Sequence, residues 1–161
     1  MEDKKEIDNI ISGMKRFLSV RERCRSEVEQ YLFRKGYSRN VIAEMTEALK
    51  EKDILDELRF TRNRIESRIH KGYGPHYIKN ELSALKIDRR IITETMEEFS
   101  EEDFLEGALA LFEKKLSQFI KEENTEERLY RALKSRGFSD SHYRFAMETA
   151  KEKFPHWSKN R

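Results

Sequence analysis

The chain has 161 residues, of which 40% are charged and 37% hydrophobic, with a formal net charge of +2 and one cysteine, Cys24. Because a typical soluble domain has about 25% charged residues, this sequence is poor in core material, and we expect an extended rather than a spherical protein. One cysteine excludes an internal disulfide, and the lack of a signal-like or membrane-spanning apolar run fits a reducing cytoplasm.

Helix is favoured nearly throughout, because only two prolines and six glycines interrupt stretches rich in Glu, Lys, Arg, Leu and Ala. Amphipathic patterns predict helices over residues 7–18, 54–70 and 104–121. A helix start is predicted at Asp53, with Asp56 three positions on at the positive end of the helix dipole. Further starts are predicted at three capping boxes, which are Ser26-x-x-Glu29, Ser100-x-x-Asp103 and Asn124-x-x-Glu127.

An internal repeat emerges when residues 28–38, 78–88 and 129–139 are superimposed at offsets of 50 and 51 residues. In each segment an apolar residue is followed four positions later by Leu, and the predicted helix then stops at Gly36, Lys86 or Gly137. Next come an apolar residue, a capping residue and, four positions after the cap, a further apolar residue, as in a hydrophobic staple. The staples are Tyr37-Ser38 with Ile42, Ile87-Asp88 with Ile92, and Phe138-Ser139 with Tyr143.

These signals predict an all-α protein of three tandem three-helix, helix-turn-helix-like repeats. The predicted repeats span residues 1–52, 53–101 and 102–154, followed by a tail at 155–161 in which Trp157 is either a docked anchor or part of a free end. A short helix pair with a tight turn does not bury its apolar face alone, so neighbouring repeats must stack on one another. We therefore expect an elongated, curved array.

No set of residues marks a catalytic, metal or cofactor site. The four histidines, expected at the surface, lack metal-ligand spacing, and no cysteine pair completes a zinc site. The carboxylates between Glu97 and Asp103 are contiguous, whereas catalytic pairs face each other across a pocket. The stretch Gly72-Tyr73-Gly74 lacks the preceding strand and third glycine of a dinucleotide fingerprint, so it is interpreted as a turn between helices. The sequence predicts a non-enzymatic protein.

Charge separates strongly along the chain. Residues 59–92 contain nine Lys/Arg and three Asp/Glu, whereas residues 94–113 contain eight acids and no base. Arg64, Arg68 and Lys71 follow i, i+4, i+7 spacing and share a helix face. We expect that face to be exposed, because Phe60 and Ile65 point to the core.

The basic middle is the predicted interaction surface, although a solvated charged face is the competing interpretation. Guanidinium groups bind phosphates and carboxylates through forked hydrogen bonds, and a tyrosine stacks on nucleic-acid bases. The proposed contact residues are Arg59, Arg62, Arg64, Arg68, Lys71, Tyr73, Lys79, Arg89 and Arg90.

The segment 53–82 resembles the RecX family, bacterial regulators of the RecA recombinase. The family pattern has an acidic pair, a Phe four residues after the second acid, and then G-x-G-x-x-x-I-x-x-x-L. The matching residues here are Asp56, Phe60, Gly72, Gly74, Ile78 and Leu82. The resemblance extends over about residues 17–154, with Cys24 standing where the family commonly has Ser and with a divergent third repeat.

The resemblance implies three three-helix repeats and a monomer that binds RecA on single-stranded DNA. It also implies restraint of filament assembly, ATPase, strand exchange and coprotease activities, and a role in DNA repair, recombination and the SOS response, without a cofactor or membrane and with weak direct DNA contact. The alternative is an autonomous helix-turn-helix-like nucleic-acid-binding module, against which the net charge of +2 and the acidic third of the chain argue. A scaffold for another partner is a third interpretation.

Overall fold

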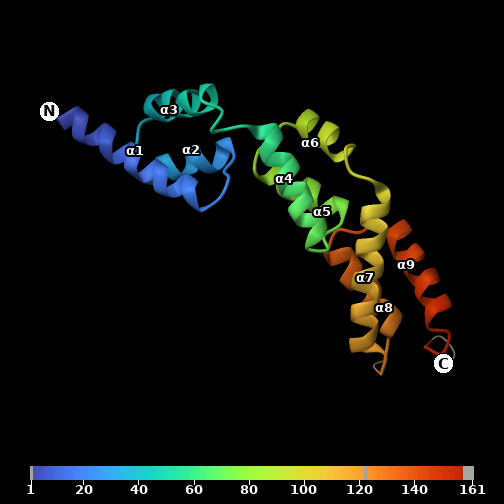
Figure 1. The fold of residues 1–161 in the computed structure, drawn as a ribbon. Coiled ribbons are helices and arrows are strands. Elements are labelled where there is room, and N and C mark those ends of the chain that lie inside the picture. Colours follow the sequence, from blue (N-terminus) through green and yellow to red (C-terminus); the bar gives the residue numbers. More distant parts are fainter. Residues whose placement is uncertain (1, 122, 158–161) are drawn as a thin grey trace. The chain divides into compact units, whose positions relative to one another are not determined.

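The computed structural model describes residues 2–121 and 123–157, which form nine α-helices and contain no strand (Figure 1). The helices are α1 (Glu2–Val20), α2 (Arg25–Arg34), α3 (Arg39–Glu51), α4 (Glu57–His70), α5 (Pro75–Ala84), α6 (Arg89–Met96), α7 (Glu101–Phe119), α8 (Thr125–Ser135) and α9 (Asp140–Lys153). The chain divides into two compact units between Phe60 and Thr61. The first unit contains α1 to α3 and the start of α4, and the second contains the remainder.

The three repeated turns form as the sequence predicts. Gly36, Lys86 and Gly137 adopt left-handed backbone conformations, with φ of +87°, +60° and +84°. In each turn the next amide donates to a leucine carbonyl five residues back, which satisfies a free carbonyl at the helix end. The predicted caps then accept backbone N–H bonds at the start of the following helix: Ser38 from Val41, Asp88 from Arg90 and Ser139 from His142.

Two predicted helix starts are wrong. Asp53 has φ of +54° and closes α3, while Asp56 caps α4 by accepting the Arg59 N–H at 2.9 Å. Ser26 lies inside α2, whose N-cap is Cys24, two residues earlier, where Glu27 accepts the Cys24 backbone N–H at 3.2 Å.

The helix starts predicted at Asn124 and Ser100 are correct, although only one of the two capping boxes forms. Asn124 is the N-cap of α8, but its backbone is left-handed and its side chain makes no capping bond, so this box does not form. The box at Ser100 and Asp103 does form, with both reciprocal bonds present.

The first unit has its own core, in which α2 and α3 lie side by side (Figure 1). Phe17 and Tyr31 stack with ring centroids 4.3 Å apart and cover one edge of the cluster. The buried apolar residues of this core are Ile10, Met14, Val28, Leu32, Ile42, Leu49 and Leu55.

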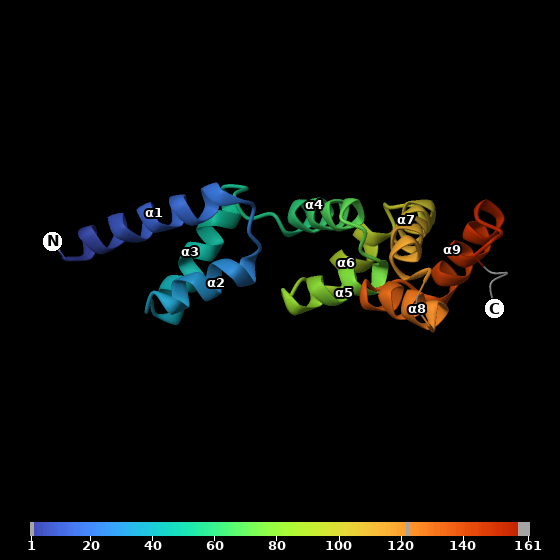
Figure 2. The same ribbon diagram turned by 90° about the horizontal axis from the view of Figure 1, so that it is seen from below.

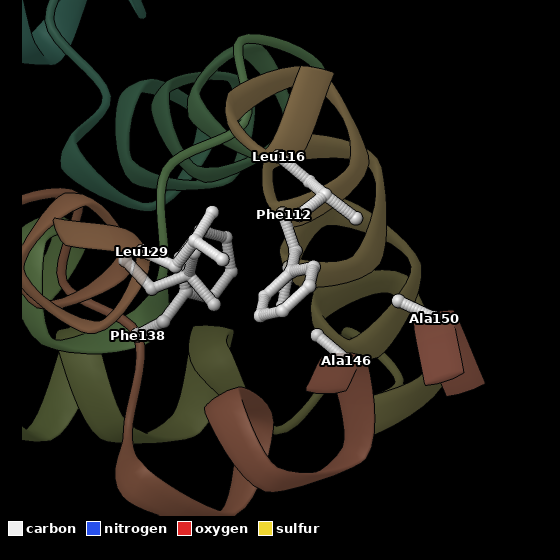
Figure 3. Packing of buried hydrophobic residues seen from close by; sticks show 8 residues of the cluster. Phe112, Leu116, Leu129, Phe138, Ala146 and Ala150 are labelled. Atoms are coloured by element: carbon white, nitrogen blue, oxygen red, sulfur yellow. The ribbon is translucent and has the colours of Figure 1, made fainter. Parts of the chain in front are cut away.

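The third repeat is held together by α7 packing on α8 and α9. Phe112 of α7 and Phe138 at the start of the α9 segment are fully enclosed, and Figure 3 shows them with the alanines of α9 that let the helices approach. Trp157 packs on the same cluster, with its ring 6.0 Å from that of Phe112. The tail is therefore docked as far as Trp157.

A backbone-to-backbone contact joins the second and third repeats within the second unit (Figure 2). The Gly74 N–H donates to the Arg136 carbonyl at 2.7 Å, and the His76 N–H donates to the Gly137 carbonyl at 3.1 Å. A β-carbon on Gly74 would lie 2.5 Å from the Gly137 backbone, and one on Gly137 would lie 2.2 Å from the Tyr77 nitrogen. The two glycines of Gly72-x-Gly74 thus differ in role: Gly72 supplies a φ of +74°, and Gly74 allows this close approach.

Candidate interaction surface

The arginines of α4 pair with acids of the same chain. The Arg59 side chain donates to Glu22 at 2.7 Å, and Arg62 donates to Glu98 at 2.6 Å. Arg62 holds the pKa of the Glu98 carboxyl below its usual range. Much of the positive charge that the sequence places on this helix is therefore balanced within the protein.

Arg64 and Arg68 converge on Glu81 of α5. Arg68 donates to both carboxylate oxygens, at 2.6 Å from its Nε, and Arg64 donates from Nη2 at 2.9 Å. The hydrogen bond from Arg68 holds the pKa of Glu81 below its usual range, although partial burial opposes this effect. The Arg64, Arg68 and Glu81 side chains are 23%, 17% and 16% exposed. The expectation of a solvent-exposed face is wrong for both arginines, because Glu81 reaches back from the neighbouring helix.

Two tyrosines and a third arginine continue this group. Tyr73 stacks on Tyr77 with ring centroids 4.2 Å apart, and Arg136 lies over the Tyr73 ring at 4.5 Å. Arg68 lies 5.5 Å from the same ring. We call these residues the arginine–tyrosine cluster, which consists of Arg64, Arg68, Tyr73, Tyr77, Glu81 and Arg136. Side chains of this chain thus engage the ring that was expected to stack on a base.

Arg136 was missed by the sequence prediction, although a signal existed. It precedes Gly137 as Lys35 precedes Gly36 in the first repeat, and both basic residues lie beside a tyrosine ring. Since Tyr73 belongs to the second repeat and Arg136 to the third, this contact adds side-chain packing to the Gly74–Gly137 backbone contact.

The remaining predicted contact residues are exposed. Lys71 follows the end of α4, Lys79 lies on α5, and Arg89 and Arg90 open α6. Arg90 is 87% exposed and lies 3.6 Å from Glu94, which is itself 66% exposed. An ion pair this exposed is worth little, so Arg90 remains available to a partner.

The motif residues lie at helix caps, turns and core positions. Asp56 caps α4. Phe60, Ile78 and Leu82 are buried, and the two glycines form the α4–α5 turn.

Three histidines are exposed as expected, but His142 is only 2% exposed and sits in the first turn of α9. Its Nδ1 accepts the Ser139 N–H at 3.1 Å, and its Nε2 lies 3.0 Å from a Glu101 oxygen. Burial lowers the pKa of the imidazole, although Glu101 opposes this effect. His142 therefore completes the capping box that begins α9, where it takes the acceptor role usually held by Glu. Through Glu101 it also links α9 to the first turn of α7.

Among the side chains that the structure describes, no group of three His, Cys, Asp or Glu is placed to hold a metal ion. No helix in the described part of the chain is long and apolar enough to cross a membrane.

The fold and this surface define an all-α protein of helix-turn-helix-like repeats whose candidate site is a charged surface. Residues 15–49 match the family model of the first three-helix domain of RecX, and residues 56–96 match that of the second. A regulatory protein RecX of Halorhodospira halophila is 33% identical over 138 residues, which cover 85% of each chain. The chain therefore belongs to the RecX family of regulatory proteins.

Further relatives and a solved structure support the same family assignment. Regulatory protein RecX of Vibrio vulnificus is 30% identical, with 81% of this chain and 85% of the relative covered. The RecX of Bacillus licheniformis is also 30% identical, and the matched region spans about half of its length (52%). A crystal structure of RecX from Lactobacillus salivarius superposes with a TM-score of 0.77 at 21% identity, covering 91% of this chain and 97% of that one, which shows the shared fold.

Proposed function

We propose that this protein regulates RecA without catalysis, by binding the RecA–single-stranded-DNA filament and restraining its assembly. ATP hydrolysis, strand exchange and coprotease activity then fall together, since all depend on the filament. Membership of the RecX family carries this proposal. It implies a monomer that acts in the cytoplasm, in DNA repair, recombination and the SOS response.

The contact surface that we propose is the basic side of α4 to α6, with two roles divided among its residues. The exposed cations Lys71, Lys79, Arg89 and Arg90 meet acidic groups of the filament. Arg62, Arg64 and Arg68, with Tyr73, hold the helices that present those cations, whereas Arg59 pairs with Glu22 within the first unit. A protein that binds one state of the filament more tightly than another shifts assembly by that difference in affinity.

The first test is RecA's single-stranded-DNA-dependent ATP hydrolysis, with the purified chain added before or after filaments form. We expect a loss of activity well below one chain per RecA. A greater effect on growing filaments indicates blocked growth, and an equal effect indicates action along finished filaments. No effect from a folded, helical chain on its cognate RecA refutes the proposal.

A second test asks whether the exposed cations of the α4 to α6 surface are the contact with RecA, independently of whether the chain regulates RecA. The variant K71E/K79E/R89E/R90E reverses four exposed charges, and K15E/K114E/K121E/R144E makes the same net change at exposed positions elsewhere. We expect the first variant to lose most of the effect on RecA while the second retains it. Equal behaviour of the two variants rules out this surface but leaves the regulation of RecA standing.

A further inference from the structure

The corner between α2 and α3 carries an unusual combination of exposed side chains. Phe33 is 68% exposed at the end of α2, although phenylalanine is ordinarily a buried residue. Arg34, Lys35 and Arg39, which follow it within six residues of sequence, are all exposed. Residues 30–43 contain these three cations and no acid, so the corner is locally positive in a chain whose net charge is only +2.

The cations of this corner differ from those of α4. Arg34, Lys35 and Arg39 form no ion pair with any acid among residues 9–121 and 123–157, whose side chains the structure describes. The α4 arginines, in contrast, are held by Glu22, Glu98 and Glu81. Unneutralised cations attract an external anion more strongly than cations that already have a carboxylate partner.

Helix geometry places the aromatic ring next to this charge. Leu32 is fully buried, so the solvent side of α2 lies opposite it, between Phe33 and Arg34. Arg39 is the first residue of α3, six positions after Phe33 in the sequence and just past the left-handed turn at Gly36. A cation at the positive end of a helix is locally unfavourable, and such conflicts are expected where function requires them.

The equivalent corners of the other repeats lack this combination. Ser83 and Lys134 stand where the first repeat has Phe33. In the third corner Asp140 replaces Arg39, pairs with Lys134 at 3.1 Å and accepts a hydrogen bond from Tyr130. That corner also packs through Gly137 on the second repeat. An exposed aromatic ring together with three exposed cations that form no ion pair among the described side chains is therefore particular to the first repeat.

We propose that the α2–α3 corner binds single-stranded nucleic acid. Phe33 stacks on an unpaired base, and Arg34, Lys35 and Arg39 contact the flanking phosphates. An aromatic platform inside a positive surface is the arrangement by which proteins hold single strands without reading sequence. A duplex keeps its bases stacked and offers the ring nothing to stack on. This contact is separate from the α4 to α6 surface and holds whether or not that surface binds RecA.

Binding is measured with the full chain by fluorescence anisotropy on a labelled 30-nucleotide oligothymidine and on a duplex of the same length. F33A is expected to weaken oligothymidine binding by at least about 5-fold with an unchanged salt dependence, while F33W retains binding. Three phosphate contacts give a slope of log affinity against log salt of about −2, or about 20-fold between 50 and 200 mM. The variant R34Q/K35Q/R39Q is expected to lose this contribution to the salt dependence, whereas the matched control K114Q/K121Q/R144Q is expected to keep it.

Several results overturn the proposal. If F33A binds oligothymidine as tightly as wild type does, the Phe33 ring does not stack on a base. Equal binding of duplex and single strand leads to the same conclusion. If the two triple variants have equal slopes of log affinity against log salt, Arg34, Lys35 and Arg39 do not contact phosphates. If polyglutamate displaces the oligonucleotide as well as unlabelled oligothymidine does at equal charge, the corner is a site for an acidic protein surface instead. All substituted residues are exposed, and circular dichroism of each variant checks that it folds.

Discussion

The Gly74–Gly137 contact predicts that three glycines will respond very differently to the same change, a single added methyl group. Gly36 and Gly137 have nearly the same left-handed φ, +87° and +84°, so alanine costs about 1 kcal/mol of backbone strain at each. A β-carbon at Gly36 meets nothing within 4 Å, whereas one at Gly137 lies 2.2 Å from the Tyr77 nitrogen. Because that neighbour is backbone, the repeats must move apart, and overpacking adds about 1–3 kcal/mol. G137A should therefore cost about 2–4 kcal/mol and G36A about 1 kcal/mol.

Urea unfolding followed by two signals checks this prediction. Trp157 is the single tryptophan and packs on Phe112, so its fluorescence reports on the second unit, while circular dichroism reports on both. G137A should lower the midpoint of the fluorescence transition, and G36A should leave that midpoint in place. G74A has no left-handed strain but would place its β-carbon 2.5 Å from the Gly137 backbone, so it should behave as G137A does. If G137A and G36A destabilise their units equally, the backbone contact between the repeats does not stabilise the protein.

Two further predictions concern titratable groups. E81Q leaves Arg64 and Arg68 without their carboxylate and should cost about 1–2 kcal/mol in urea unfolding, against less than about 0.5 kcal/mol for the exposed control E66Q. Because the folded-state pKa of Glu81 is lowered, its stabilisation is present above the unfolded pKa of about 4.3 and is lost as the pH falls through the folded value. E81Q should flatten the acid limb of the stability curve, and an unchanged limb would show that the pair contributes nothing. His142 also has a lowered pKa, so wild type should lose stability as the pH falls below about 6.5. H142Q should remove that part of the loss, and a profile identical to wild type would contradict this account of the cap.

The turns and the repeat were predictable because each depends on residues close in sequence. Gly36 and Gly137 are followed by an aromatic residue and Ser, and that local chemistry sets both the helix stop and the next start. The start of α2 was mispredicted for an equally local reason. Its N-cap is Cys24, a poor capping residue at the position where the RecX pattern has Ser. Ser26, two residues on, offered a capping-box pattern that the chain does not use.

Contacts between helices were less accessible to prediction. Arg68 and Glu81 are 13 residues apart and meet only because the turn at Gly72 folds α5 back along α4. The sequence predicted that turn, so pairing residues across it would have revealed the ion pair. The approach of Gly74 to Gly137 spans two repeats and depends on how they pack, and no local pattern indicates which glycine needs the space.

Several acids of the stretch 94–113, which follows the basic middle, bind groups of the same chain. Glu98 pairs with Arg62, and Glu101 lies against His142. Asp103 completes the capping box of α7, whose first turn holds three acids at the positive end of the helix dipole. Counting cations along the sequence therefore overestimates the surface available to a partner. A filament or a nucleic acid would be drawn first to exposed cations without such partners, and these include Arg34, Lys35 and Arg39 of the α2–α3 corner as well as Lys79 and Arg89 of α5 and α6.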